Sequence, residues 1–211
     1  MNLHRWWLGL GLLALCGCKA AADPNALVQP FVDAFDRAEL GADWKNTGGT
    51  WLAQDNALHG HHGYNHPLWL NKTLPRNVRI EFDIWTPDPD GDLKVEVFGD
   101  GKTFDPDRGS YTATSYVFIF GGWKNTQSKI ARKDEHRKED PARTDVRVVP
   151  NQKYHWVIER KDGATVEWSL DGKPFLKLTD DDPLFGPGHD HFAVGNWETP
   201  VFLDNLNITP L

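Results

Sequence analysis

The chain has 211 residues, of which 39% are hydrophobic and 12% aromatic, and its formal net charge is -7. This length allows one large domain or two small ones, and the apolar fraction suffices for a packed core, which argues against a disordered chain. The acidic balance argues against a nucleic-acid partner, because phosphate binding needs clustered Lys and Arg, and the densest charged run, residues 131–140, alternates in sign as in a solvated loop or short helix.

The first 17 residues predict a signal peptide that is not part of the fold. Residues 1–5 are positively charged, and the apolar residues 6–15 are too few to span a bilayer. The next residues, Leu15-Cys16-Gly17-Cys18, resemble the lipobox of bacterial lipoproteins, in which small residues precede a cysteine that is lipidated and becomes the mature N-terminus. The resemblance implies that Cys18 is the lipid anchor and the only contact with a membrane. A plain secretory signal is the alternative.

The residues around the anchor predict a location and the start of the folded domain. Lys19 stands where an inner-membrane retention signal of enteric bacteria would have Asp, so we expect an outer-membrane or cell-surface lipoprotein exposed to the periplasm or the exterior. Residues 18–30 indicate a tether, and residues 31–211 a single domain. Both cysteines lie at the signal boundary, so this domain has no disulfide, thiolate ligand or cysteine nucleophile.

Alternating side chains predict strands along the rest of the chain. Residues 78–85 form the first clear example, with a core face made of Val78, Ile80, Phe82 and Ile84. Residues 93–98 repeat the alternation. Residues 116–120 are apolar on both faces, as in a strand that is covered on two sides.

The second half of the chain predicts an antiparallel meander. Residues 154–160, 165–170 and 173–178 alternate, and Asp162-Gly163 and Asp171-Gly172 between them favour tight turns with positive φ. Residues 192–194 and 201–208 predict the last strands. No long amphipathic helix follows the signal, so the pattern indicates two packed sheets in a β-sandwich or jelly roll.

The order of several short motifs is similar to that of concanavalin A-like lectin/glucanase jelly rolls. The motifs are Phe35-Asp36-Arg37 with Trp44, Gly49-Thr50-Trp51, Asn56-Ala57-Leu58, the Asp171-Gly172 hairpin and Phe202-Leu203-Asp204-Asn205-Leu206-Asn207-Ile208. The resemblance covers nearly the whole chain from residue 31 to residue 211. It implies an all-β fold, a β-sandwich of two antiparallel sheets.

The closing stretch, residues 192–202, is similar to the end of bacterial 3-keto-disaccharide hydrolase-like domains of this superfamily. Where those domains commonly have His and Arg, this chain has Trp197 and Asp204, so no catalytic role is carried over. Glu81 and Asp83 share a strand face and are similar to the start of the glucanase pattern Glu-x-Asp-x-x-Glu. Because Thr86 stands in place of the last Glu, we interpret this face as solvated rather than catalytic.

Histidines gather in two segments, HGHHGYNH at residues 59–66 and GPGHDHF at residues 186–192. A transition-metal site needs three or four ligands that converge, and on an extended chain His62 points away from His59 and His61. We expect these imidazoles to form hydrogen bonds in loops that border a sugar cleft, with a metal site as the alternative.

Aromatic residues beside amides and carboxylates indicate carbohydrate binding, because sugars stack on Trp or Tyr and hydrogen-bond to planar polar groups. The three groups are residues 64–69, 121–125 and 196–198. Some tryptophans belong to the core instead, and alternation predicts this for Trp156 and Trp168. The candidate ligand-binding residues are Tyr64, His66, Trp123, Arg132, His136, His191, Asn196 and Trp197.

Two alternatives to a binding protein stay open. The first is a glycoside hydrolase or lyase of the same fold acting on a bacterial or plant polysaccharide, with Glu198, Asp134 or Glu135 as acid or base. The second is a structural envelope protein without a ligand. No cofactor is required for binding, and a structural calcium ion held by Asp36 and Asp204 is a further hypothesis, since such jelly rolls often bind Ca²⁺ away from the ligand cleft.

Overall fold

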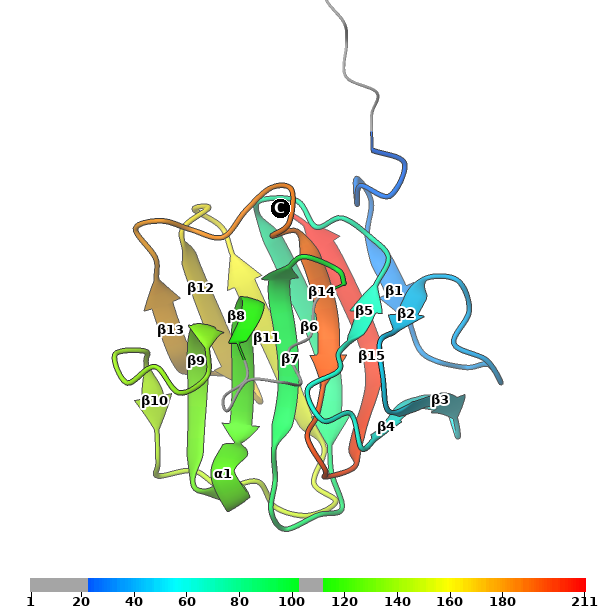
Figure 1. The fold of residues 1–211 in the computed structure, drawn as a ribbon, viewed down its shortest axis with the longest axis vertical. Helices are drawn as coiled ribbons and strands as arrows, with labels where there is room; N and C mark the ends of the chain where they lie inside the picture. The colour runs from blue at the N-terminus through cyan, green and yellow to red at the C-terminus, as the bar shows by residue number, and fades with distance from the viewer. Residues whose placement is uncertain (1–22, 103–111) are drawn as a thin grey trace, which may run out of the picture.

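The computed structural model describes residues 23–102 and 112–211, which fold into two antiparallel sheets that face each other (Figure 1). The strands of the first half are β1 (Phe31–Asp33), β2 (Trp44–Asn46), β3 (Thr50–Gln54), β4 (Ala57–His61), β5 (Leu68–Leu70), β6 (Val78–Trp85) and β7 (Leu93–Gly99). They are followed by β8 (Thr112–Gly121), α1 (Gly122–Asn125), β9 (Gln127–Asp134), β10 (Ala142–Arg143), β11 (Tyr154–Arg160), β12 (Thr165–Leu170), β13 (Lys173–Thr179), β14 (His191–Gly195) and β15 (Val201–Pro210).

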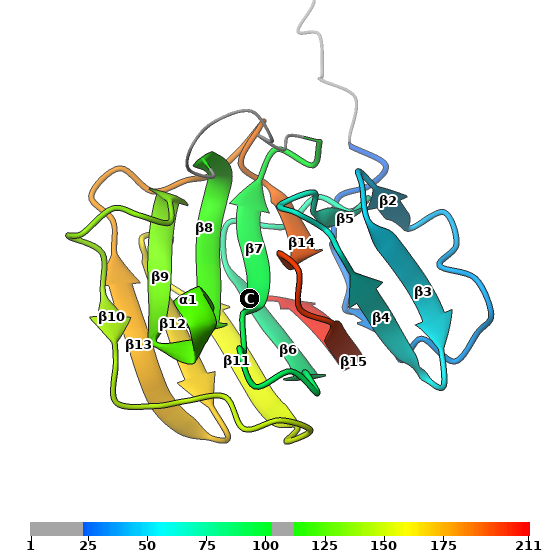
Figure 2. The same cartoon turned by 60° about the horizontal axis from the view of Figure 1, so that its bottom comes forward.

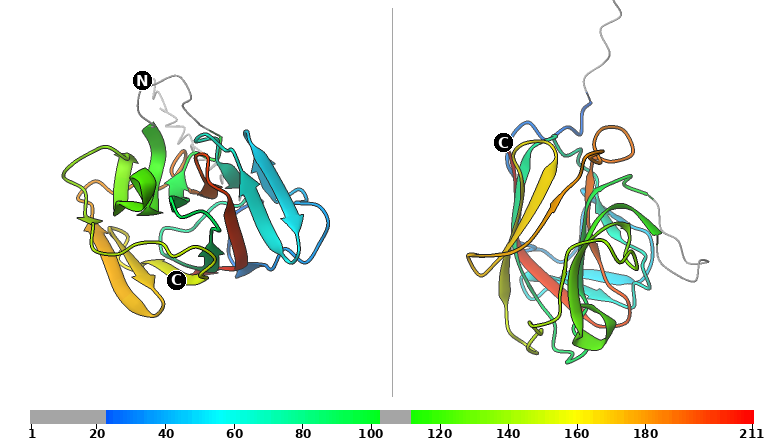
Figure 3. Two further views of the ribbon diagram at one scale, coloured as in Figure 1. Left: turned by 90° about the horizontal axis from the view of Figure 1, so that it is seen from below. Right: turned by 90° about the vertical axis from the view of Figure 1, so that its left-hand side faces the viewer.

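The eight-stranded sheet has the order β13-β12-β11-β6-β15-β4-β3, with β1 also paired to β15. The seven-stranded sheet has the order β10-β9-β8-β7-β14-β5-β2, and Figure 2 shows it in front of the other. Every strand pairing in both sheets is antiparallel. The side view in Figure 3 shows the two sheets as separate layers, which confirms the predicted all-β sandwich.

The core lies between the two sheets and contains the apolar face predicted for residues 78–85. Its residues in β6 are buried and alternate with partly exposed ones, as the sequence pattern requires. Trp156 and Trp168 are both buried, with ring centroids 4.3 Å apart, so their predicted core position is confirmed. The two predicted hairpins form as well, since β11 pairs with β12 and β12 with β13.

Two segments differ from the expectation. Residues 131–134, predicted as loop or helix, complete strand β9, because Ile130 and Ala131 are both buried against neighbouring strands and the charged residues follow at the strand end. The expected tether over residues 18–30 is in contact with the fold from residue 25 on. Leu27 donates its N–H to the carbonyl oxygen of Thr73 at 2.9 Å and packs against the core.

The membrane predictions concern residues that the structure does not describe. The signal peptide and the anchor at Cys18 lie outside the described residues. Within residues 23–102 and 112–211, no helix is long and apolar enough to cross a bilayer.

The outer face of the seven-stranded sheet combines short side chains with buried charged ones. One row across the sheet joins Gly195, Lys94, Ile119 and Lys129, which are direct partners on neighbouring strands. The next row contains Ala193, Glu96, Val117 and Ala131. Lys94, Glu96 and Lys129 are each at most 4% exposed, although they point away from the core. Buried charges on an outer face are uncommon unless they serve a site, which makes this face the candidate.

Candidate functional site

Trp123 lies in a one-turn left-handed segment between β8 and β9. Trp123, Lys124 and Asn125 have φ angles of 52°, 58° and 58°, and the Thr126 hydroxyl closes the turn by donating to the carbonyl oxygen of Trp123 at 2.7 Å. Residues other than glycine rarely take this conformation, because Cβ approaches the following carbonyl oxygen at a cost of about 1–2 kcal/mol per residue. Three in succession indicate that the surroundings hold the segment in place.

The side chain of Asn125 supplies that support. Its amide nitrogen donates to the carbonyl oxygens of Val148 at 2.8 Å and Pro89 at 3.0 Å, and its amide oxygen accepts from the Val148 N–H at 2.8 Å. Gly121 precedes the turn with a φ of 71°, and a Cβ atom there would lie 2.6 Å from both Asn125 Oδ1 and Val148 Cγ2. Glycine is therefore required at this position for reasons of both conformation and space.

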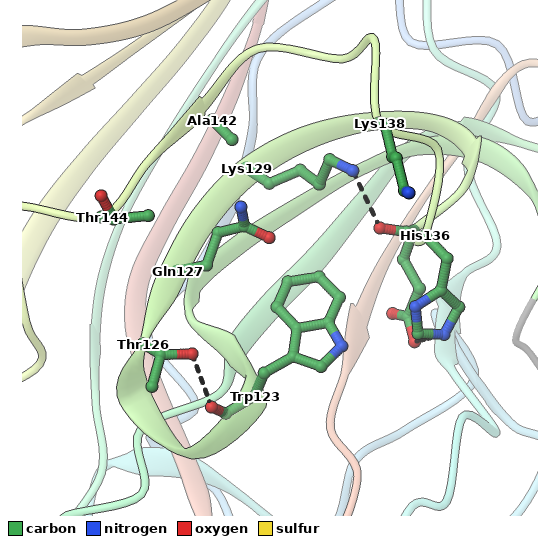
Figure 4. Close-up of a pocket in the computed structure, with 9 residues that line it drawn as sticks. Trp123, Thr126, Gln127, Lys129, His136, Lys138, Ala142 and Thr144 are labelled. Carbon is green, nitrogen blue, oxygen red and sulfur yellow. Dashed lines mark hydrogen bonds and ion pairs between the residues drawn. The ribbon is translucent and has the colours of Figure 1, made fainter.

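A groove of about 440 Å³ lies beside the turn on the outer face of the seven-stranded sheet (Figure 4). It is lined by Trp123, Thr126, Gln127, Lys129, Glu135, His136, Lys138, Ala142 and Thr144. Trp123 is 37% exposed, and the ring of His136 meets its indole edge-on with centroids 5.8 Å apart. The groove thus joins an accessible aromatic surface to hydroxyl, amide, imidazole and amine groups.

Next to the groove, Lys94 forms a buried ionic cluster with two carboxylates. Its Nζ atom lies 3.0 Å from Glu135 Oε2 and 4.0 Å from Asp92 Oδ1. Burial disfavours the charged amine, but the two carboxylates outweigh it and raise the pKa of Lys94 above its ordinary value. Burial also raises the pKa of Asp92, and Lys94 offsets this only in part. Lys94 and Glu135 therefore form the shorter of the two ion pairs.

Tyr64 and Trp197 form a second accessible aromatic surface. Their rings meet edge-on with centroids 5.2 Å apart, and the two residues are 42% and 44% exposed. The buried amide of Asn196 joins the two loops, since its oxygen accepts from the Gly63 N–H at 2.9 Å and its nitrogen donates to the Thr199 carbonyl oxygen at 2.8 Å. The Tyr64 N–H also donates to the Trp197 carbonyl oxygen at 3.1 Å, so the pair has a fixed geometry.

Asp92 and Lys94 connect the two aromatic surfaces. Lys94 Nζ donates to Asn65 Oδ1 at 3.3 Å, next to Tyr64. The Asp92 N–H donates to the Gly121 carbonyl oxygen at 2.9 Å, while its carboxylate accepts from the backbone N–H of Trp197. The three segments grouped by the sequence analysis therefore lie around one polar centre on the same face of the molecule.

The comparisons with known proteins agree on the fold. No protein-family model matches the chain, and no curated protein matches it. A carbohydrate-binding module, CBM66 from Bacillus subtilis, is similar at 16% identity and a TM-score of 0.56, covering 82% of this chain and 98% of its own. A Bacillus subtilis protein of unknown function with a galectin-like fold is similar at 15% identity and a TM-score of 0.62, covering 85% of this chain and 94% of its own. A Bacillus licheniformis β-glucanase is similar at 11% identity and a TM-score of 0.58, covering 87% of this chain and 99% of its own.

The chain has a jelly-roll β-sandwich fold similar to that of these structures. This confirms the β-sandwich fold that the order of motifs indicates. At these identities the likeness establishes the fold alone, and the function has to be argued from the site.

Five of the predicted site residues lie at the groove or beside it in this jelly roll. Trp123, Glu135 and His136 line the groove, and Trp197 belongs to the second aromatic surface with Tyr64. The prediction that Asn196 contacts a ligand is wrong, because this side chain is fully buried and its amide joins the two loops. Its contribution is to position the aromatic rings.

Other predicted residues have structural partners elsewhere. Arg132 is in register with the core residue Tyr116, and its guanidinium binds Asp180 at 2.7 Å, so the prediction that it reaches the cleft is wrong. His191 lies at the other end of β14 from Asn196 and contacts Asp190 at 2.7 Å.

The remaining candidates stand at the edge of the site or outside it. The His66 ring is hydrogen-bonded to the Thr47 carbonyl oxygen at 2.9 Å, and the Asp134 carboxylate accepts from the His136 N–H at 2.9 Å. Glu198 is exposed on the connection between β14 and β15. None of these three lines the groove.

The two histidine segments do not converge on a metal. His59 packs its ring edge-on against Phe202 with centroids 4.5 Å apart, on the outer face of the eight-stranded sheet, while His189 is hydrogen-bonded to the Thr114 carbonyl oxygen at 2.7 Å. Within the described ranges, no group of three or more His, Cys, Asp or Glu side chains could hold a metal ion. Calcium at Asp36 and Asp204 stays a prediction. The Asp204 carboxylate is near Lys153 Nζ at 3.8 Å and accepts the Asn205 N–H at 2.6 Å.

Sequence reasoning missed the charged centre of the site. Lys94 lies in β7 and Asp92 directly before it, in a segment whose alternation predicts one solvated face. Their partner Glu135 comes 41 residues after Lys94 in the sequence. The alternation in residues 93–98 correctly places Lys94 on the outer face, but it contains no sign that a distant turn covers that face. Lys129 was missed for the same reason.

Proposed function

We propose that this protein binds carbohydrate in the groove beside Trp123 and along the adjoining Tyr64–Trp197 surface. The observation that carries the proposal is the exposed indole at the wall of a polar groove. Sugars present apolar C–H faces to aromatic rings and hydroxyl groups to amides and hydroxyls, and Thr126, Gln127 and Thr144 supply the latter here.

The strained turn supports a binding function over a structural one. If the aromatic ring were buried in the core, its packing energy could offset the cost of three left-handed residues, but Trp123 remains 37% exposed. Strained backbone that leaves a large apolar side chain in solvent is typical of ligand-binding positions, where the geometry of the ring matters more than its burial. The hydrogen bonds of Asn125 offset the conformational cost and fix the ring before a ligand arrives.

The names of structural neighbours support the same class of ligand. One neighbour is a carbohydrate-binding module and another is a β-glucanase, and both match most of this chain. We extend the proposal to the cellular setting that the sequence indicates: an exported lipoprotein, anchored through Cys18 at the outer membrane or cell surface, that holds polysaccharide or oligosaccharide near the envelope.

The test is a binding screen with the domain from residue 23 onward. Affinity electrophoresis through gels that contain laminarin, xylan, polygalacturonate, alginate or carrageenan reports binding as retardation. We expect retardation by at least one polymer, and its loss in Trp123→Ala and in the double variant Tyr64→Ala/Trp197→Ala. No retardation by any polymer would overturn the proposal. If these variants change the melting temperature but no polymer is bound, the results favour a structural envelope protein without a ligand.

Glycoside cleavage is the second candidate, and one observation favours it. Asp92 and Glu135 flank Lys94, and burial raises the pKa of Asp92 while Glu135 is paired with the ammonium. Two carboxyl groups in unlike environments are what acid and base catalysis by a hydrolase requires. Release of reducing ends or unsaturated products from the same polymers, abolished by Glu135→Gln, would establish cleavage. Binding without product formation would exclude it for those polymers.

A further inference from the structure

The groove contains two amines, those of Lys129 and Lys138, whose charge no carboxylate of the described residues balances. Lys129 is only 4% exposed, and its Nζ atom donates to the carbonyl oxygens of Glu135 at 3.0 Å and of Arg137. These acceptors are neutral. Lys138 also lines the groove, and among the described residues neither amine has a carboxylate within 4.0 Å.

The acidic groups around the groove are already paired. Glu135 is the one carboxylate among the described residues that lines the groove. One of its oxygens lies 3.0 Å from Lys94 Nζ, and the other lies 3.8 Å from His136 Nε2. Glu139 and Asp140 of the same turn both lie near the guanidinium of Arg137, at 3.5 Å and 3.8 Å. The groove is therefore locally cationic in a chain whose net charge is -7.

We infer that the preferred ligand of this groove is an acidic sugar, one that carries a carboxylate or sulfate group. The inference rests on the proposed function and specifies the chemical class of its ligand. Figure 4 shows the ammonium ends of Lys129 and Lys138 and the ring of His136 around the space beside the indole of Trp123. A pyranose ring stacked on the indole places a ring substituent within reach of these donors.

Electrostatics explains why a charged substituent matters in this geometry. Carbonyl oxygens bring no formal negative charge to an ammonium group, and a charge that is partly buried is screened less by solvent and salt than an exposed one. An anionic substituent would accept a hydrogen bond from the third N–H of the Lys129 ammonium group and would balance the positive charge of Lys138. A neutral sugar would stack equally well on Trp123 but leave both amines without a counter-charge.

The test compares each acidic polymer with its own neutral derivative. Polygalacturonate and alginate are converted to neutral polymers of the same linkage by carboxyl reduction, and carrageenan by desulfation. We expect an acidic polymer to bind about tenfold or more tightly than its neutral form, and the preference to shrink as NaCl rises. Equal or tighter binding of the neutral forms overturns the inference and leaves the proposed function standing. Absence of binding to every polymer overturns both.

Two charge variants separate a local effect from a general one. Lys138→Gln removes a cation from the groove, and Lys173→Gln removes an exposed cation from β13 of the other sheet, so both change the net charge by the same amount. We expect Lys138→Gln to weaken binding of the acidic polymer about threefold and to leave the neutral form unaffected. Equal weakening by Lys173→Gln would show that net charge, not the groove, attracts the polymer.

Discussion

Lys94 Nζ lies 3.0 Å from Glu135 Oε2, and this ion pair joins the centre of the seven-stranded sheet to the turn that forms one side of the groove. Asp92 Oδ1 lies 4.0 Å from the same ammonium and connects it to the backbone of Trp197. The stacking surfaces are thus organised by a buried charge cluster. The fold and the binding geometry consequently depend on the same side chains.

Removing Lys94 should destabilise the protein strongly. In Lys94→Met, the carboxylate of Glu135 remains buried without its partner, and breaking a buried ion pair in this way costs about 3–5 kcal/mol. The double variant Lys94→Met/Glu135→Gln should lose less than the sum of the single losses, because the uncompensated charge is absent. Urea unfolding followed by tryptophan fluorescence measures each free energy. Additive losses would show that the two groups do not interact.

Gly121→Ala should disrupt the turn that holds Trp123. The new Cβ would lie 2.6 Å from Asn125 Oδ1, in addition to the strain at a φ of 71°. Gly172→Ala is the matched control, since its φ is 74° and no atom lies within 4 Å of a Cβ there. We expect the control to lose about 1 kcal/mol of unfolding free energy and Gly121→Ala at least about 1 kcal/mol more. Equal losses in the two variants would mean that the turn adapts to the extra atom.

Asp33 should contribute stability that disappears at acidic pH. Its carboxylate accepts from both terminal nitrogens of Arg37 at 2.5 and 2.8 Å and from the indole of Trp44 at 2.8 Å. Burial opposes ionisation, but these hydrogen bonds hold the pKa of Asp33 below its ordinary value of 3.8. A lowered folded-state pKa gives stability that is present above the unfolded-state pKa and lost as pH falls through the folded-state pKa.

The variant Asp33→Asn checks that prediction directly. Near pH 6 it should be less stable than the unmodified chain by about 1–3 kcal/mol, and the difference should narrow as pH falls from about 4 toward 2. Urea midpoints across this range provide the measurement. A difference that stays constant with pH would contradict the assigned role of the carboxylate charge.

The fold could be predicted because its determinants are local. Alternation places Val78, Ile80 and Phe82 on one face, and the Asp171-Gly172 pair sets the hairpin between β12 and β13. The Phe35-Asp36-Arg37 motif and Trp44 are held together by Asp33, whose carboxylate accepts hydrogen bonds from Arg37 and Trp44. No sequence pattern singles out Asp33 itself.

The site could be predicted only in part because its charges meet through long-range contacts. The sequence predicts an aromatic binding group at residues 121–125, and Trp123 lies partly exposed in a left-handed turn there. Asn196 was predicted to contact the ligand because it precedes Trp197, and Arg132 because the mixed charge of its segment suits a polar ligand. Their side chains instead bind Asp180 and the loop at Gly63, which only the three-dimensional pairing of strands reveals.

The most direct test of the account compares two partly exposed tryptophans on opposite faces of the sandwich. Trp123 stands at the groove, whereas Trp85 lies on the outer face of the eight-stranded sheet, stacked on Phe202 with centroids 5.5 Å apart. Isothermal titration calorimetry uses the polysaccharide fragment that is retained best in the binding screen. The account predicts that Trp123→Ala weakens binding about tenfold or more while Trp85→Ala binds as the unmodified chain does. Loss of binding in Trp85→Ala with full binding in Trp123→Ala would contradict the assignment of the site.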